Sequence, residues 1–196
     1  MIEKRSLSTE IWVYESKNNL PAKDAEMLDI ASKAARRAHA LYSGFHVGAA
    51  LLLDDGTIIE GNNQENAAYP SGLCAERVAL FYASATFPQK KIKAIAITAY
   101  SAKEPVTWPV SPCGACRQVM AEYESKHGSP IRIIMHGETG EAFVADSVSD
   151  LLPLMFDKKS LAGKKWNDVS VRKSFLFLIN KNRTLQIFLR KKITNN

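Results

Sequence analysis

The sequence has few cysteines, no long apolar run and no apolar leader. It contains three cysteines in 196 residues. No apolar run approaches the roughly 18 residues that a membrane-spanning helix requires, and segments such as Phe175 to Ile179 are far too short. Met1 to Arg5 leads into polar sequence, so we expect no secretory leader and a cytoplasmic location. In that reducing compartment, cysteines act as metal ligands or buried thiols more often than as disulfides.

The composition is that of a folded globular protein. Apolar residues make up 46% of the chain and charged residues 23%, which excludes a disordered, collagen-like or disulfide-scaffold protein. A chain of this length predicts one domain with an appendage, and such a domain can bury a core without disulfides.

The positive charge is concentrated in one terminal segment. The net charge is +6, but residues 161–196 carry nine Lys or Arg and one acidic residue, Asp168, for a net +8. Residues 1–160 carry 17 basic and 19 acidic side chains, for a net −2. The main body therefore lacks the basic surface that nucleic-acid or membrane binding requires.

Helical and strand patterns alternate along the body of the chain. An apolar stripe at Leu28, Ala31, Ala35 and Ala38 predicts a helix from Asp24 to about Tyr42. Further helices are predicted over 74–86 and 113–126, with a short one at 147–152, and strands over 47–53, 57–59, 92–100, 131–135 and 142–144. This alternation predicts a three-layer α/β domain with helices on both faces of one sheet.

The chain divides into three parts. We expect an N-terminal extension over 1–23 with a strand-like stretch at Ile11 to Tyr14, and a domain over 24–160. The basic tail over 161–196 contains two apolar segments, 174–179 and 184–189, that could form a hairpin. We interpret the tail as an accessory segment that is flexible or packs at a subunit contact.

All three cysteines lie in two short motifs, Cys74-Ala75-Glu76-Arg77 and Pro112-Cys113-Gly114-Ala115-Cys116-Arg117-Gln118. Cys113 and Cys116 are three residues apart at the start of a predicted helix, so they share a face and could share a metal ion. Cys74 could supply a third thiolate. Three protein ligands leave the fourth tetrahedral position open for water, as a catalytic zinc site requires.

Other interpretations of the cysteines are less favoured. A lone C-x-x-C is more often a redox pair or half of a structural zinc site. A four-cysteine site needs another thiol, which this chain lacks, and the histidines lie outside the two motifs: His39, His46, His127 and His136.

Glu76 could approach the metal without binding it, as a general acid/base should.

The two motifs match the three-cysteine form of the zinc-deaminase signature, H-x-E…P-C-x-x-C. The chain resembles the cytidine deaminase family of the small-subunit type, and the segments Phe45 to Ala50 and Asn63 to Tyr69 share in the resemblance, which covers about residues 24–160. The resemblance implies an α/β/α fold with one mixed sheet, one zinc ion per subunit and a homotetramer with shared active sites. It implies a hydrolase of pyrimidine salvage that deaminates cytidine and 2′-deoxycytidine to uridine and 2′-deoxyuridine with release of ammonia.

The resemblance also assigns roles to individual residues. Cys74, Cys113 and Cys116 would bind zinc, and Glu76 would carry protons from water to N3 and to the departing amine. Arg77 and Arg117 would donate to the zinc thiolates. The predicted substrate contacts are Phe45 against the pyrimidine, Asn63 and Glu65 at the sugar 3′-hydroxyl, and Ala75, while Ala67, Tyr69 and Phe156 would complete a neighbouring subunit's site.

Two other functions remain in competition. A deaminase of another cytosine-bearing nucleoside, of the blasticidin type, would share the three-cysteine zinc site but lack the Glu65-Asn66-Ala67-x-Tyr69 loop. A non-catalytic, zinc-containing nucleic-acid-binding protein would use the basic tail to bind phosphate. A tRNA or DNA editor would more often have histidine in place of Cys74.

Overall fold

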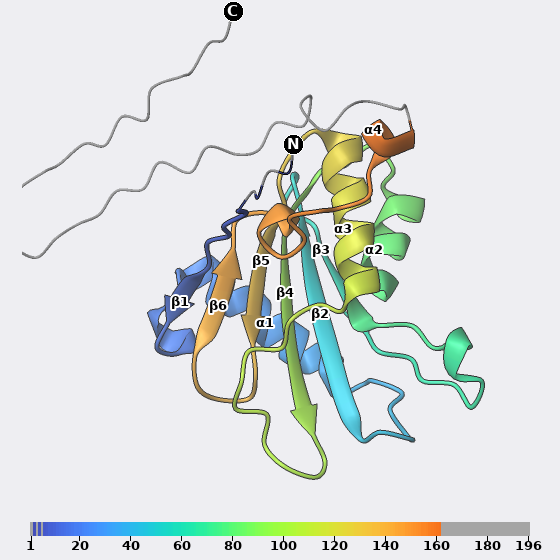
Figure 1. Cartoon of the computed structure of the whole chain (residues 1–196). Coiled ribbons are helices and arrows are strands. Elements are labelled where there is room, and N and C mark those ends of the chain that lie inside the picture. Colours follow the sequence, from blue (N-terminus) through green and yellow to red (C-terminus); the bar gives the residue numbers. More distant parts are fainter. Residues whose placement is uncertain (1, 3, 5, 162–196) are drawn as a thin grey trace, which may run out of the picture.

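A single mixed sheet with helices on both faces forms the domain (Figure 1). The structure is a computed structural model that describes residues 2, 4 and 6–161. The basic tail beyond residue 161, with its predicted hairpin, lies outside the described residues. No helix in the described part of the chain is both long and apolar enough to cross a membrane.

The sheet contains six strands in the order β1-β6-β5-β4-β2-β3. The strands are β1 (Trp12–Tyr14), β2 (Phe45–Leu53), β3 (Ile58–Asn62), β4 (Ile92–Ser101), β5 (Arg132–His136) and β6 (Ala142–Ala145). β4 and β5 pair in parallel, and the other neighbouring strands pair antiparallel. The predicted α/β fold with one mixed sheet is therefore confirmed, and the strand-like stretch near the N-terminus is the edge strand β1.

The helices lie on opposite faces of this sheet. α1 (Ala22–Ala35) covers one face, while α2 (Ala75–Thr86) and α3 (Gly114–His127) cover the other (Figure 1). The remaining helical elements are short: η1 (Lys17–Asn19), η2 (Tyr69–Ser71), η3 (Val148–Asp150) and α4 (Lys158–Leu161). Apolar residues of the central strand β4 pack on both sides, with Ala96 toward α1 and Ile97 toward α2 and α3. This arrangement gives the buried core two layers.

Two glycines allow the helices to approach the sheet closely. A Cβ atom at Gly48 of β2 would lie 1.9 Å from the carbonyl oxygen of Ala31 in α1. A Cβ atom at Gly61 of β3 would lie 2.3 Å from the carbonyl oxygen of Ala75 in α2. Both distances are far below a van der Waals contact, so a larger residue at either position would displace a helix. Gly61 thus fixes the depth at which α2 packs on the sheet.

Two predicted helices are shorter in the structure. α1 ends at Ala35 and not near Tyr42. Beyond that point the Ala34 carbonyl accepts from the Arg37 amide at 3.0 Å and from Nδ2 of Asn62 at 3.2 Å. The chain beyond α1 then pairs with the loop after β3, where the His39 amide donates to the Asn63 carbonyl at 3.0 Å. The predicted helix at 147–152 is the single turn η3, which Ser147 caps by accepting from the Ser149 amide at 3.2 Å.

Candidate active site

The three cysteines meet where α2 and α3 begin. Cys74 is the N-cap residue of α2, Cys113 is the N-cap residue of α3, and Cys116 lies in the first turn of α3. The Sγ atom of Cys113 is 3.8 Å from that of Cys74 and 3.5 Å from that of Cys116. Within the described residues, these three sulfurs form a group that could hold a metal ion, all within 4.8 Å of one another.

This cluster has the dimensions of a zinc site. A tetrahedral zinc ion with Zn–S bonds of about 2.3 Å places its sulfurs about 3.8 Å apart, which agrees with the 3.5 and 3.8 Å separations found here. The sulfurs are too far apart for a disulfide, whose bond is about 2.05 Å, and all three cysteines are unpaired thiols. The donor set therefore fits zinc with one coordination position left for water.

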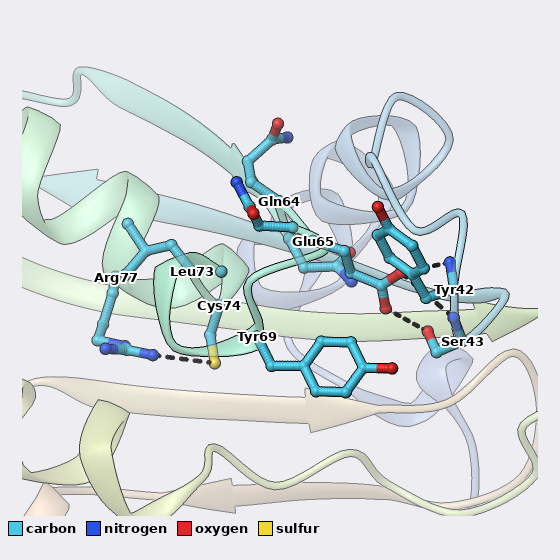
Figure 2. Close-up of a pocket in the computed structure, with 11 residues that line it drawn as sticks. Tyr42, Ser43, Gln64, Glu65, Tyr69, Leu73, Cys74 and Arg77 are labelled. Carbon is cyan, nitrogen blue, oxygen red and sulfur yellow. Dashed lines mark hydrogen bonds between the residues drawn. The ribbon is translucent and has the colours of Figure 1, made fainter.

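Hydrogen bonds and nearby positive charge favour the ionised form of Cys74. The two helix N-termini present unsatisfied N–H groups, and Arg77 donates from Nη2 to the Cys74 sulfur at 3.5 Å (Figure 2). A hydrogen bond from Cys116, with the one from Arg77, lowers the pKa of the Cys74 thiol to about 5. The same hydrogen bond to Cys74, with burial, raises the pKa of Cys116. A second thiolate beside the first thus needs a bound divalent cation to neutralise it.

Glu76 is a buried carboxylate beside the cysteine cluster. It lies in the first turn of α2 and is 4% exposed. Burial raises the pKa of its carboxyl group, and the negative charge of Cys74 adds to the effect. A carboxyl group whose pKa is raised holds a proton more readily than a free one, which suits a general acid/base.

A cavity of about 490 Å³ extends from Cys74. Figure 2 shows its residues running from Arg77 and Cys74 at one end to Tyr42 and Ser43 at the other. The lining comprises Tyr42, Ser43, Asn63, Gln64, Glu65, Asn66, Tyr69, Gly72, Leu73, Cys74 and Arg77. One wall of this cavity is the loop between β3 and α2, so the predicted ribose-binding residues and the first cysteine line one space.

Asn63 and Glu65 are both engaged by the protein's own backbone. The Asn63 side chain accepts from the Val47 amide at 2.7 Å and donates to the Phe45 carbonyl at 3.0 Å. The Glu65 carboxylate accepts from the Tyr42 amide at 2.8 Å, and from the Ser43 amide at 3.2 Å and hydroxyl at 2.5 Å. These bonds, first among them that from the Ser43 hydroxyl, lower the pKa of Glu65. An ionised carboxylate with two oxygens retains capacity for a further donor.

Of the other predicted substrate-contacting and subunit-sharing residues, only Tyr69 lines this cavity. Phe45 is half-buried at the start of β2, and Ala75 is fully buried as the first residue of α2; neither is among the lining residues. Ala67 is exposed, as are Tyr69 at 78% and Phe156 at 60%. Tyr69 lies in the cavity wall, and its ring meets that of Tyr42 edge-on with the centroids 6.3 Å apart.

Tyr42 and Ser43 are site residues that the sequence analysis did not identify. The helix predicted from the apolar stripe runs to about Tyr42, and no motif distinguishes this segment in the sequence. Hydrogen bonds to Glu65 and the edge-on contact with Tyr69, both residues of a different loop, place the pair at the cavity. The signal is thus tertiary and not local.

Arg117 contacts carbonyl groups in the structure. Its Nε donates to the Pro112 carbonyl at 2.8 Å and its Nη1 to the Leu151 carbonyl at 2.7 Å. Among the described hydrogen bonds, Arg77 is the arginine that donates to a cysteine sulfur, and Arg117 donates to carbonyl oxygens instead. The geometry thus directs Arg117 to the loop that precedes Cys113, because a fork of planar N–H donors can hold two carbonyls at once.

Comparison with known proteins identifies the family. Residues 21–128 match the family described as the cytidine and deoxycytidylate deaminase zinc-binding region. A cytidine deaminase of Sporosarcina psychrophila is 43% identical over 141 residues, which cover 71% of this chain and 96% of that protein. A cytidine deaminase of Halalkalibacterium halodurans is 41% identical over 131 residues, 67% of this chain and 92% of that protein.

Solved structures agree with the sequence comparison. The crystal structure of cytidine deaminase from Burkholderia pseudomallei has a TM-score of 0.58 at 38% identity, covering 67% of this chain and 97% of that one. The cytidine deaminase from Mycobacterium tuberculosis has a TM-score of 0.51 at 30% identity, covering 67% and 95%. The cofactor that the cysteine cluster binds is zinc, as the family description and the donor set agree. The chain belongs to the cytidine and deoxycytidylate deaminase family.

Proposed function

We propose that the protein catalyses the zinc-dependent hydrolytic deamination of cytidine and 2′-deoxycytidine to the corresponding uridines and ammonia. The observation that carries the proposal is the juxtaposition of three thiols at metal-binding distance with a buried carboxylate, Glu76, where one of the thiols, that of Cys74, also lines a nucleoside-sized cavity. Relatives at 41% and 43% identity are cytidine deaminases, which supports this substrate class.

The cysteine end of the site supplies the nucleophile. When bound to Cys74, Cys113 and Cys116, zinc would activate a water molecule for attack. Arg77 would withdraw charge from the Cys74 sulfur through the hydrogen bond that it donates. This donation, with the two helix N-termini, would offset the negative charge of three thiolates around one divalent ion.

Glu76 would move the protons. Its carboxylate takes a proton from the attacking water and delivers it to N3 of cytosine as the C4–O bond forms. A second proton passes from the new hydroxyl group through Glu76 to the amine, the C4–N bond breaks, and ammonia leaves with uracil as the product. The burial of Glu76 supports this role, because it raises the pKa of the carboxyl group and so helps the group to hold the proton between the two transfers.

The opposite end of the cavity would hold the sugar. Glu65 keeps acceptor capacity for a sugar hydroxyl. The side-chain amide of Asn63 bonds to the backbone of β2 and so fixes the loop that carries it. We propose that both residues bind the 3′-hydroxyl and that Phe45 lies against the pyrimidine, with Ala75 beside it. Arg117 would then act on the site by positioning the loop before Cys113.

We propose that the active protein is a homo-oligomer, with a tetramer expected, in which subunits share their sites. Tyr69 and Phe156 expose 78% and 60% of their surfaces, and Leu154 exposes 62%. Tyr69 also lines the cavity, and large apolar side chains that are exposed in this way are typical of a surface that a second copy covers. Ala67, Tyr69 and Phe156 would complete the neighbour's pocket. The unpaired thiols fit a reducing compartment such as the cytoplasm.

The test is an ultraviolet assay of the purified protein on cytidine and on 2′-deoxycytidine, with zinc measured on the same sample. We expect turnover of a nucleoside, release of one ammonia per uridine formed, and one zinc per chain. Zinc-loaded protein that acts on neither nucleoside would contradict the proposal. An aminoacylated cytosine nucleoside would then be the next substrate to test.

A further inference from the structure

The segment that follows β6 crosses α3 and carries Phe156 at its far end. Figure 1 shows this orange segment passing from η3 across α3 toward α4. α3 also carries Cys116 in its first turn. The zinc-binding helix and the segment that leads to Phe156 are therefore in direct contact, which raises the question of what fixes one against the other.

Three polar side chains of α3 hold this segment at its beginning, middle and end. Glu124 accepts from the Val148 amide at 3.0 Å and from the Ser147 hydroxyl at 2.8 Å. Arg117 donates to the Leu151 carbonyl at 2.7 Å, and Gln118 donates to the Phe156 carbonyl at 2.7 Å. All the partners on the segment except the Ser147 hydroxyl are backbone groups, so these bonds set the path of the chain.

Packing restrains the middle of the segment but not Phe156 itself. Leu151 and Met155 pack against the core beside α2 and α3. Phe156 is 60% exposed, so few contacts of its ring fix its position within the subunit. The hydrogen bond from Gln118 to its carbonyl is therefore a polar restraint on the backbone at the residue whose ring is exposed.

We propose that Gln118 is a positioning residue that sets Phe156 for its place in the neighbouring subunit's nucleoside pocket. The inference rests on the proposed role of Phe156 in that pocket. Because Gln118 follows Cys116 by two residues on the same helix, the bond ties the backbone at Phe156 to the helix that holds zinc. The zinc site of one subunit and the nucleoside pocket of the next are thereby held in register.

Gln118 is distinct from Arg117 in what it touches. Arg117 also binds the carbonyl of Pro112, the residue before a zinc ligand, so its replacement would disturb the metal site. Among the described residues, the hydrogen bond recorded for the Gln118 side chain is the one to Phe156. Loss of that bond should weaken substrate binding and leave both zinc content and kcat unchanged.

The experiment compares Gln118→Ala, Gln118→Glu and Phe156→Ala with the double variant Gln118→Ala/Phe156→Ala. Gln118→Glu keeps the shape but replaces the donor with an acceptor. We expect both Gln118 variants to raise KM for cytidine about three- to tenfold, the range for one lost hydrogen bond. Zinc per chain, kcat and oligomer size should stay at wild-type values. Gln89→Ala, at an exposed glutamine, is the matched control and should leave KM unchanged.

The double variant decides whether Gln118 acts through Phe156. We expect Gln118→Ala to add nothing to KM in the Phe156→Ala background, because the side chain that it positions is gone. An equal rise in both backgrounds, an unchanged KM in both single Gln118 variants, or loss of zinc would overturn the inference while leaving the proposed function intact. An unchanged KM in Phe156→Ala alone would contradict the proposed role of Phe156, and the inference with it.

Discussion

At the cysteine end of the active site the reactive groups come from the first turns of two helices, whereas at the nucleoside end they come from two loops. The cysteine end consists of Cys74, Cys113, Cys116 and Glu76. The nucleoside end consists of Tyr42, Ser43, Asn63, Glu65 and Tyr69. The first set is held by the starts of the two helices, with Cys116 and Glu76 also buried, and the second by hydrogen bonds between segments far apart in the sequence.

This difference explains why the metal site is formed by the starts of two helices alone, whereas the nucleoside end depends on contacts between separate loops. Helix N-termini fix the spacing of Cys113 and Cys116 within one turn, so the metal site needs few other contacts. At the nucleoside end, Glu65 accepts three hydrogen bonds from Tyr42 and Ser43, and Tyr69 is 78% exposed. Replacements at the two ends should therefore act on different kinetic and binding quantities.

The largest effect is expected from a lost zinc ligand. Cys116 is fully buried, and Cys116→Ala removes one of three protein ligands. We expect zinc content to fall well below one per chain and turnover to disappear, since loss of the ion removes the activated water. Metal analysis and the cytidine assay on one sample measure both. Full zinc content with retained activity would show that the cysteine end does not depend on this ligand.

A replacement at the nucleoside end should instead preserve zinc. Glu65→Gln keeps the size of the side chain but removes the charge that would bind a sugar hydroxyl. We expect kcat/KM for cytidine to fall about tenfold or more, the range for a lost charged hydrogen bond. Glu60→Gln, at an exposed carboxylate of β3 that pairs with Arg37, is the matched control. Equal losses in the two variants would contradict a specific role for Glu65.

Tyr69 tests the contribution of the exposed aromatic side chains. Because Tyr69 is 78% exposed, Tyr69→Ala should change the free energy of unfolding of a subunit very little. We expect KM to rise about three- to tenfold, as for a lost aromatic contact, and the oligomer to dissociate at a higher protein concentration. Tyr82→Ala, at a 56% exposed position of α2 outside the cavity, is the comparison for KM. Unchanged KM and oligomer size in Tyr69→Ala would show that no neighbour uses this ring.

The smallest effect concerns acid stability. The Ser43 hydroxyl, with the amides of Tyr42 and Ser43, lowers the pKa of Glu65 from its ordinary 4.5, so the folded state favours the ionised form. The resulting stabilisation is present above the ordinary pKa and is lost as the pH falls through the lowered one. Between about pH 5 and pH 3, the wild type should therefore lose more unfolding free energy than Glu65→Gln. Denaturant titration of both proteins measures this, since both share the same cysteines, and equal losses would contradict it.

Local sequence features were enough to predict the cysteine end. The starts of α2 and α3 agree with the predicted 74 and 113 to within one residue, because in each motif the first cysteine is the N-cap residue of the helix that follows. The single mixed sheet with helices on both faces followed from the alternation of helices and strands together with the family resemblance, whereas the strand order β1-β6-β5-β4-β2-β3 was not predicted. The nucleoside end could be predicted only in part, because the resemblance supplied Asn63 and Glu65 but no local pattern marks Tyr42 and Ser43.

The discrepancies arise from contacts between residues far apart in the sequence. The apolar stripe predicted for α1 extends to Ala38, yet the helix ends at Ala35, where Asn62 of β3 donates to the carbonyl of Ala34. Arg117 lies next to a cysteine in sequence, yet its guanidinium donates to the carbonyls of Pro112 and Leu151. Neither partner could be inferred from helical periodicity.

Zinc content and turnover of Glu76→Ala, measured on one preparation, test the central claim most directly. Glu76 is the buried carboxylate beside the cluster, and it is not among the metal-binding group. We expect zinc at the wild-type level of one per chain, with kcat for cytidine reduced about 10²- to 10⁴-fold or more, the contribution of general acid–base catalysis. Wild-type turnover in the zinc-loaded variant would contradict the account, because the protons would then travel by a route that does not involve Glu76.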